Sequence, residues 1–234
     1  MKANDPNVIL LELVAQRLGT ELRERMVFVG GAVAGLLITD PAMPAIRPTE
    51  DVDLVVQVAV LQEYHAIEQE LAGRGFVQDM GPDAPICRWR VGDVAVDVMP
   101  TIETVLGFSN RWYPLAAETA QPVALPGGVE IRLVRAPMFV ATKLEAFAGR
   151  GNNDFLFSHD LGDLIAVVDG RESLVAECRD SGEELKSYLR SRFSSLIGNS
   201  AFVEALPGHL AGDAASQERL PDLEDRLRAL AELE

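Results

Sequence analysis

Two aspartates at the start of one apolar run constrain this chain more than any other feature. The run from Asp51 to Val56 is rich in β-branched residues, which predicts a buried strand over residues 52–57. Because side chains alternate across a strand, Asp51 and Asp53 are expected on one face, with Val52, Leu54 and Val56 on the other. Two carboxylates fixed side by side suit a hard divalent cation such as Mg²⁺, which binds oxygen ligands.

A pair of glycines precedes these aspartates by twenty residues. Gly30 and Gly31 end an apolar run over residues 26–29, read as a strand, and open a segment over residues 31–38 that is compatible with a helix. Glycines at such a turn leave backbone N–H groups accessible to an anion, and the helix dipole adds to the attraction. A glycine turn for phosphate and paired aspartates for metal together predict chemistry on nucleoside triphosphates.

A hairpin supplies a third carboxylate. Residues 86–91 and 94–99 are expected as strands joined by Gly92 and Asp93, a two-residue turn that tolerates positive φ. This turn places Arg88 opposite Asp97 on the polar face of the hairpin. Asp97 is therefore the natural third member of the aspartate group, and Arg88 is expected to neutralise it across the strands.

The pattern along the chain changes near residue 135. Before it, strands alternate with helices; after it, the spacing of apolar residues is helical throughout. We therefore expect an α+β fold, with a mixed-sheet core over residues 1–135 and a helical C-terminal domain over residues 136–234. The remaining expected elements are helices over 6–25 and 61–71, a loop over 40–48, a strand over 130–134, and helices over 137–149, 158–168, 171–179, 183–197, 201–210 and 222–233.

Charge and composition exclude several classes of protein. The net charge is −15 and is spread evenly over both halves, with no run of Lys or Arg, so an extended nucleic-acid surface is not expected. Binding of one RNA end at a small local site remains compatible with this charge. No apolar run approaches the roughly 18 residues of a membrane span, and the first residues lack a signal peptide. Cys87 and Cys178 have no metal-binding spacing, which indicates reduced thiols and a cytoplasmic protein.

The same residues resemble a known superfamily. Gly30-Gly31, then Arg47-x-Thr49-x-Asp51-x-Asp53, then Asp97, are similar to the pattern of DNA-polymerase-β-type nucleotidyltransferases. The C-terminal part resembles the nucleotidyltransferase toxins of the AbiEii type, on three segments: Lys143-Leu144-Glu145-Ala146, Gly149-Arg150-Gly151 and Ser158-His159-Asp160-Leu161-Gly162-Asp163-Leu164. The resemblance covers about residues 26–170. It differs at Ala32, where the family often has Ser or Thr, and at His159, where the family has a basic residue.

The resemblance implies roles for individual residues and a nucleotidyltransferase-type core. Three aspartates would be catalytic and would bind two Mg²⁺ ions: Asp51, Asp53 and Asp97. Eight residues would bind the nucleotide, with the lysine on the β- and γ-phosphates: Gly30, Gly31, Arg47, Thr49, Lys143, Arg150, Asp160 and Asp163. If the resemblance is set aside, Asp160 and Asp163 are expected only to complement the dipole of a helix capped by Ser158. Lys143 is then expected to be an exposed helix lysine.

The expected activity is Mg²⁺-dependent transfer of a nucleoside monophosphate from an NTP to an acceptor hydroxyl. By resemblance, the acceptor is an RNA end or a protein, and the setting is a toxin with a cognate antitoxin. One alternative is a small-molecule nucleotidyltransferase of the aminoglycoside type, since an acidic surface attracts polycations. The other is a non-catalytic nucleotide-binding module. The sequence does not identify the base, the acceptor or the oligomeric state.

Overall fold

The chain passes three times between two structural units. The computed structural model describes residues 4–234. The first unit contains the described residues up to Val33 together with Arg47–Arg135, and the second contains Ala34–Ile46 and Ala136–Glu234. The segment Ala34–Ile46 therefore belongs to the second unit, although residues of the first unit flank it on both sides. The division into two domains at residue 135 stays a prediction.

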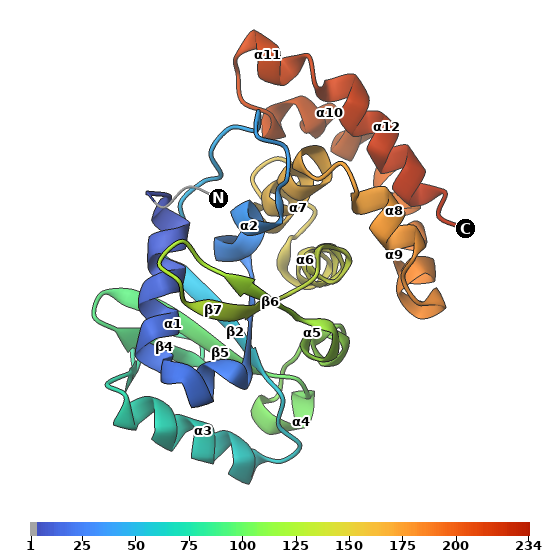
Figure 1. Ribbon diagram of the computed structural model, residues 1–234. Helices are drawn as coiled ribbons and strands as arrows, with labels where there is room; N and C mark the ends of the chain where they lie inside the picture. The colour runs from blue at the N-terminus through green and yellow to red at the C-terminus, as the bar shows by residue number, and fades with distance from the viewer. Residues whose placement is uncertain (1–3) are drawn as a thin grey trace. The chain divides into compact units, whose positions relative to one another are not determined.

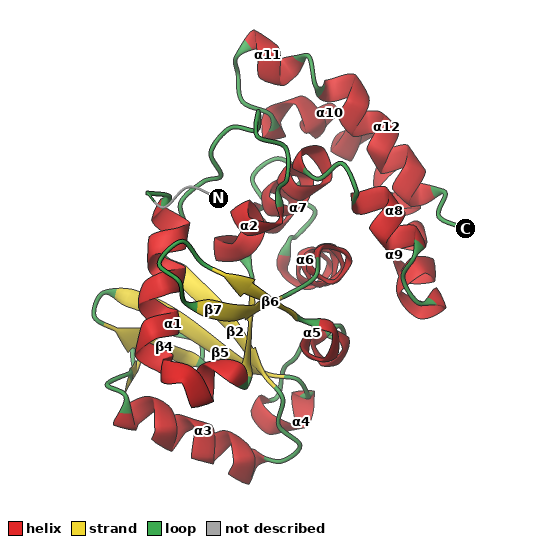
Figure 2. Cartoon of the chain, in the orientation of Figure 1, coloured by secondary structure: helices red, strands yellow, loops and turns green. Residues whose placement is uncertain are grey.

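A seven-stranded mixed sheet forms the centre of the first unit (Figures 1 and 2). Its strand order is β3-β4-β5-β2-β1-β7-β6, in which β2 is parallel to β5 and antiparallel to β1, and β1 is parallel to β7. The strands are β1 (Met26–Val29), β2 (Asp51–Val56), β3 (Val77–Gln78), β4 (Arg88–Val91), β5 (Val94–Pro100), β6 (Gln121–Ala124) and β7 (Glu130–Leu133). The sequence did not predict the edge strands β3 and β6. β3 has only two residues, and β6 is mostly exposed and contains Pro122, so neither shows the alternation of a half-buried strand.

The predicted hairpin is confirmed, register included. Gly92 adopts a φ of +59° at the turn, where an L side chain would be strained. Val91 then pairs with Val94, and Arg88 pairs with Asp97. The face of the hairpin expected in the core is buried, at Cys87, Trp89, Val91, Val94, Val96 and Val98.

Helix α1 (Pro6–Glu24) packs on β1, β2 and β7 of this sheet (Figure 1). Asp5 caps its first turn, because the Asp5 carboxylate accepts a hydrogen bond from the backbone N–H of Asn7 at 2.9 Å. The buried residues recur at helical spacing: Asn7, Val8, Leu11, Val14, Ala15, Leu18 and Leu22. Four shorter elements complete the unit: the 3₁₀ turn η1 (Gly31–Val33), α3 (Leu61–Gly73), α4 (Glu103–Leu106) and α5 (Tyr113–Thr119).

The helix expected over residues 31–38 is confirmed only in part. The structure has the 3₁₀ turn η1 and then α2 (Ala34–Leu37), a helix of one turn. Hydrogen bonds within the second unit end α2 early: the carbonyl oxygen of Leu37 accepts from Arg171, and the N–H groups of Thr39 and Asp40 donate to the carbonyl of Gly170. These tertiary partners replace the bonds that a longer helix would make. A helix this short also gives little dipole to the glycine turn.

The second unit is helical, as Figure 2 shows by its lack of strands among the described residues. Pairs α6–α7 and α9–α12 make its most extensive contacts. Its main helices are α6 (Ala136–Arg150), α7 (His159–Gly170), α8 (Leu174–Arg179), α9 (Glu183–Ile197), α10 (Ser200–His209), α11 (Ala214–Gln217) and α12 (Leu220–Ala231). The predicted α+β class, with a mixed sheet followed by helices, is confirmed. Within residues 4–234, no helix combines the length and apolar character needed to cross a membrane.

Both cysteines are buried free thiols. Cys87 lies in the first unit and Cys178 in the second. Burial raises the pKa of each thiol to about 12, so the thiolate form that would react or bind metal is disfavoured. The prediction of reduced, structural cysteines agrees with these positions.

Candidate functional site

Three aspartates converge on one face of the sheet in the first unit. In the parallel pair β2–β5, Asp53 lies opposite Asp97, and Asp51 lies two residues before Asp53 on the same face. One carboxylate oxygen from each of the three residues lies within 4.8 Å of the others. The predicted convergence is confirmed, and the group could hold a metal ion.

Gly30 packs directly against one of these carboxylates. A Cβ added at Gly30 would lie 2.6 Å from the Cβ of Asp53 and would overlap its carboxylate. Gly30 also has a φ of +72°, in the left-handed region that favours glycine. The turn after β1 therefore needs glycine for two independent reasons, and its backbone lies beside the aspartate group.

Arg88 is the counter-ion of the aspartate group. Its Nε lies 2.8 Å from Asp97 Oδ1 and its Nη2 lies 2.7 Å from Asp97 Oδ2, which is a bidentate pair. The same Nη2 lies 3.5 Å from Asp51 Oδ2. Hydrogen bonding to Asp97 raises the pKa of Arg88 further above its usual value. Arg88 thus contacts two of the three aspartates, and a divalent cation bound among the carboxylates would add further positive charge.

The loop before β2 is held by a residue that the sequence analysis did not identify. Asn7 of α1 is 3% exposed; its Nδ2 donates to the carbonyl of Arg47 at 3.1 Å, and its Oδ1 accepts from the N–H of Thr49 at 2.9 Å. The Thr49 hydroxyl donates to Asp51 Oδ1 at 2.6 Å. A signal was present, because Asn7 is a polar residue on the otherwise apolar face of an amphipathic helix.

The donor set of the aspartate group fits Mg²⁺. All three candidate ligands are carboxylates, and hard oxygen ligands suit Mg²⁺ better than the softer transition metals. Neither histidine nor cysteine belongs to this group. Mg²⁺ keeps waters or phosphate oxygens as further ligands, so three protein oxygens are sufficient.

The other predicted site residues form an ion-pair cluster in the second unit. Lys143 of α6 places its Nζ 3.1 Å from Asp160 Oδ1 and 2.7 Å from Asp163 Oδ2, both on α7. The Lys143 side chain is only 9% exposed, so the expectation of an exposed lysine in the absence of a functional role is wrong. Arg150 binds Asp160 through Nε at 2.8 Å and Nη2 at 2.9 Å, although its side chain is 73% exposed. Lys143 and Arg150 thus both pair with acidic residues of α7.

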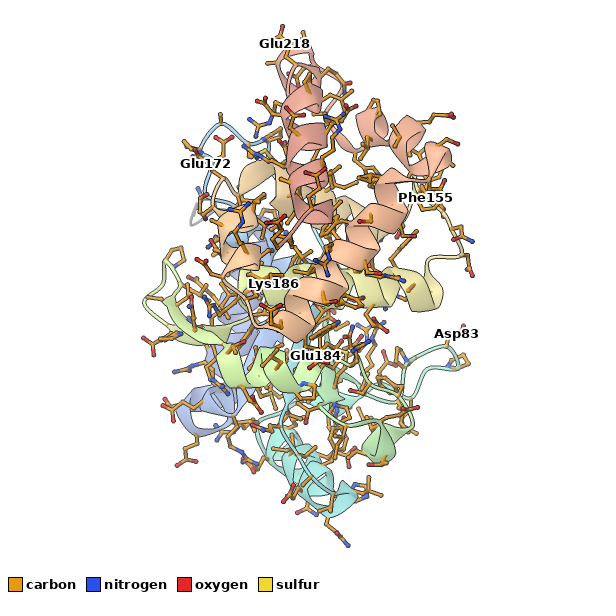
Figure 3. All side chains as sticks on the ribbon, turned by 90° about the vertical axis from the view of Figure 1, so that its right-hand side faces the viewer. Asp83, Phe155, Glu172, Glu184, Lys186 and Glu218 are labelled. Atoms are coloured by element: carbon orange, nitrogen blue, oxygen red, sulfur yellow. The ribbon has the colours of Figure 1, made fainter. Side chains whose placement is uncertain are left out.

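The start of α7 is anchored around the same cluster. Ser158 caps the helix by accepting from the N–H of Leu161 at 3.4 Å, as predicted. Phe155, labelled in Figure 3, lies in the segment between α6 and α7, with its ring centroid 5.6 Å from that of Phe147 and 6.0 Å from that of Phe202. Aromatic packing and ion pairs therefore fix both ends of this connection. His159 is exposed at the first turn of α7.

The predicted site residues thus fall into two sets. The first unit contains Gly30, Gly31, Arg47, Thr49, Asp51, Asp53 and Asp97; the second contains Lys143, Arg150, Asp160 and Asp163. Hydrogen bonds and close packing connect most members of each set to one another. That any of these residues binds a nucleotide stays a prediction.

Comparison with known proteins finds similarity to solved structures. The sequence matches no family model and no curated protein. The crystal structure of JHP933 from Helicobacter pylori is similar over 96% of this chain and 90% of that one, with a TM-score of 0.46 and 14% identity. A proposed nucleotidyltransferase from H. pylori is similar over 97% and 93%, with a TM-score of 0.45 and 12% identity. At this identity and these scores, neither likeness assigns a function to the chain.

The Gly30–Asp53 contact generates the first prediction. We expect Gly30→Ala to lower the free energy of unfolding by about 1–3 kcal/mol, because the new side chain meets Asp53 and the residue stays at positive φ. Denaturant unfolding measures this loss. Gly73→Ala is the control, since a Cβ at Gly73 meets nothing within 4 Å. Equal stability of Gly30→Ala and the wild type would contradict the close contact.

The buried cluster generates the second prediction. We expect Lys143→Met to lower the free energy of unfolding by about 3–5 kcal/mol, because it leaves Asp160 and Asp163 with too little positive charge nearby. The control is Arg228→Met on α12, whose side chain is 54% exposed and pairs with Glu224 and Asp225. An exposed pair of this kind contributes about 0–1 kcal/mol. Similar losses in both variants would argue against a buried ion-pair cluster.

The third prediction concerns pH. Burial acts to raise the pKa of Asp160, but Arg150 and Lys143 outweigh burial and lower this pKa below its usual value. A carboxyl group of this kind stabilises the fold above its unfolded pKa of about 3.9, and the stabilisation is lost as the pH falls through the folded pKa. We expect the wild-type unfolding free energy to drop more steeply from about pH 6 to about pH 3 than that of Asp160→Asn. Glu204→Gln, which removes an exposed carboxylate of the same unit, is the control.

Proposed function

We propose that this protein is a Mg²⁺-dependent nucleotidyltransferase, which moves a nucleoside monophosphate from an NTP to an acceptor hydroxyl. The observation that carries the proposal is the aspartate group: three carboxylates from two parallel strands, with ligand atoms within 4.8 Å. Three such groups repel one another unless a cation is present. A rigid sheet that nevertheless holds them together favours a metal-binding role over an incidental cluster.

Each residue has a part in this chemistry. Asp51 and Asp53 would hold the metal at the α-phosphate, and Asp97 would complete the ligand set. Bound Mg²⁺ would neutralise phosphate charge and lower the pKa of the acceptor hydroxyl. The acceptor oxygen forms a bond to the α-phosphorus while the bond from that phosphorus to the bridging oxygen breaks, and pyrophosphate leaves with the electron pair. The hydroxyl proton passes to solvent.

The surroundings of the aspartates support this division of roles. Arg88 binds both oxygens of Asp97, and this bidentate pair fixes the orientation of the carboxylate on β5. Gly30 lies against Asp53. A phosphate bound to a Mg²⁺ ion that Asp53 holds would therefore lie beside the backbone of the glycine turn. With Ala32 in place of a hydroxyl residue, contact at this turn would come from backbone N–H groups.

The finer assignments come from the family resemblance. Contact of the nucleotide with Lys143, Arg150, Asp160 and Asp163 stays a prediction, and the ion pairs among these residues are an alternative use of their charges. An RNA end, a protein or a small molecule is the proposed acceptor, and a cognate antitoxin the proposed partner if the protein is a toxin. The net charge of −15 specifically favours a polycationic small molecule as the second candidate.

One experiment separates these possibilities. The protein is incubated with Mg²⁺ and each α-labelled NTP in turn, together with total RNA, protein extract or aminoglycosides. The fraction that gains label identifies both the base and the acceptor class. A nucleotide-binding module without catalysis would bind NTP and transfer no label to any fraction.

The fourth prediction uses Asp53, which belongs to both the strand and the glycine contact. We expect Asp53→Asn to abolish label transfer, because an amide is a poor ligand for Mg²⁺ in place of a carboxylate. The melting temperature without metal should equal or exceed that of the wild type, since one repelling charge is removed. Asp93→Asn, in the exposed hairpin turn, is the control. Wild-type transfer activity in Asp53→Asn would refute the proposed site.

The fifth prediction concerns ligand binding. We expect Mg²⁺ with an NTP to raise the melting temperature far more than either alone, because phosphate oxygens complete the metal ligand set. Linkage gives about 2.7 kcal/mol at a ligand concentration of about 100 times Kd. Differential scanning fluorimetry with all four NTPs measures the shift. No shift with any NTP at millimolar concentration would contradict both the enzyme and the nucleotide-binding module.

A further inference from the structure

The buried carboxamide of Asn7 is costly unless it is fully hydrogen-bonded. Its neighbours on the same face of α1 are apolar, at Leu11, Val14 and Leu18, so an apolar residue would pack there as well. Instead, Asn7 binds one backbone group on Arg47 and one on Thr49. Both groups lie before β2 begins at Asp51, where the ladder between strands supplies no partners.

Thr49, in the same loop, contacts Asp51, the first of the three aspartates along the chain. The Thr49 hydroxyl donates to Asp51 Oδ1 at 2.6 Å, while Arg88 Nη2 lies 3.5 Å from Asp51 Oδ2. The carboxylate of Asp51 is therefore oriented from two sides. Each oxygen has a further lone pair, so these contacts leave the carboxylate able to bind a cation.

We propose that Asn7 and Thr49 are positioning residues for the metal site: Asn7 fixes the backbone of residues 47–49, and Thr49 then orients the Asp51 carboxylate toward the other two aspartates. This role rests on the proposed function. Asp53 pairs on both sides, with Val29 of β1 and Asp97 of β5, whereas Asp51 is the first residue of β2 and pairs with Ala95 of β5 beyond the end of the β1–β2 pairing. The Asn7 and Thr49 contacts therefore add support where the ladder is one-sided. Partners that orient metal ligands in this way typically change metal affinity by about 10- to 100-fold when they are removed.

The test measures the affinity for Mn²⁺ alone by electron paramagnetic resonance, as a spectroscopic probe in place of Mg²⁺. We expect Asn7→Ala and Thr49→Val each to raise the Kd for Mn²⁺ about 10-fold or more. Thr49→Ser should restore the wild-type Kd, because it keeps the hydroxyl donor. Val8→Ala is the matched control: Val8 is buried on the next position of α1, and its truncation should lower the melting temperature while leaving the Kd unchanged.

A second measurement is independent of metal. Hydrogen exchange at the N–H of Thr49, which donates to Asn7, should be slow in the wild type and in Val8→Ala, and fast in Asn7→Ala. Slow exchange in Asn7→Ala would overturn the proposed fixing of the loop.

The outcomes separate this inference from the function on which it rests. If Asp53→Asn abolishes Mn²⁺ binding but Asn7→Ala and Thr49→Val bind as the wild type does, the positioning role is overturned and the metal site stands. If the wild type binds no Mn²⁺, the metal site and the positioning role are both overturned. A weakened affinity in Thr49→Ser equal to that in Thr49→Val would also overturn the role of the hydroxyl.

Discussion

Repulsion among three carboxylates on one face of a sheet is the constraint around which the first unit is arranged. Asp51, Asp53 and Asp97 reach their positions because β2 and β5 are parallel and in register. Arg88 supplies one opposing charge, and the register of the hairpin puts it opposite Asp97. Two further contacts hold the aspartates in place: the Thr49 hydroxyl donates a hydrogen bond to Asp51, and Gly30 packs against Asp53. The fold thus gathers three carboxylates and a bidentate arginine in one cluster, which could hold a metal ion.

The second unit also holds acidic side chains close together, and there they form ion pairs with basic side chains. Lys143 and Arg150 pair there with Asp160, and Lys143 also pairs with Asp163. A hydrogen-bonded cluster of this kind contributes to the specific packing of α6 against α7. The group that could hold a metal ion is that of the three aspartates in the first unit.

The sequence was sufficient where local pattern decides the structure. Alternation fixed the faces of the hairpin strands and brought Asp97 and Arg88 together, and helical spacing identified α1 and α9. It was insufficient where tertiary partners decide: Arg171 and Gly170 end α2 after one turn. Asn7 was missed because its importance depends on a loop forty residues away. The buried state of Lys143 likewise depends on the packing of a second helix, which spacing within one helix does not reveal.

The location of Ala34–Ile46 in the helical unit has a consequence for how the protein can be divided. Within that unit, Ile38 and Met43 fill the space that a side chain at position 170 would need, and Asp40 binds Arg219 at 2.8 Å. A fragment cut at residue 135 would keep this segment but lose all of these partners, and would expose the apolar residues. In the complementary fragment, Gly170 would lose its contacts with Ile38 and Met43, and Arg219 would lose its ion pair with Asp40. A chimaera that exchanges one unit between related chains would therefore fold only if the thirteen residues Ala34–Ile46 came from the same parent as the helices of the second unit.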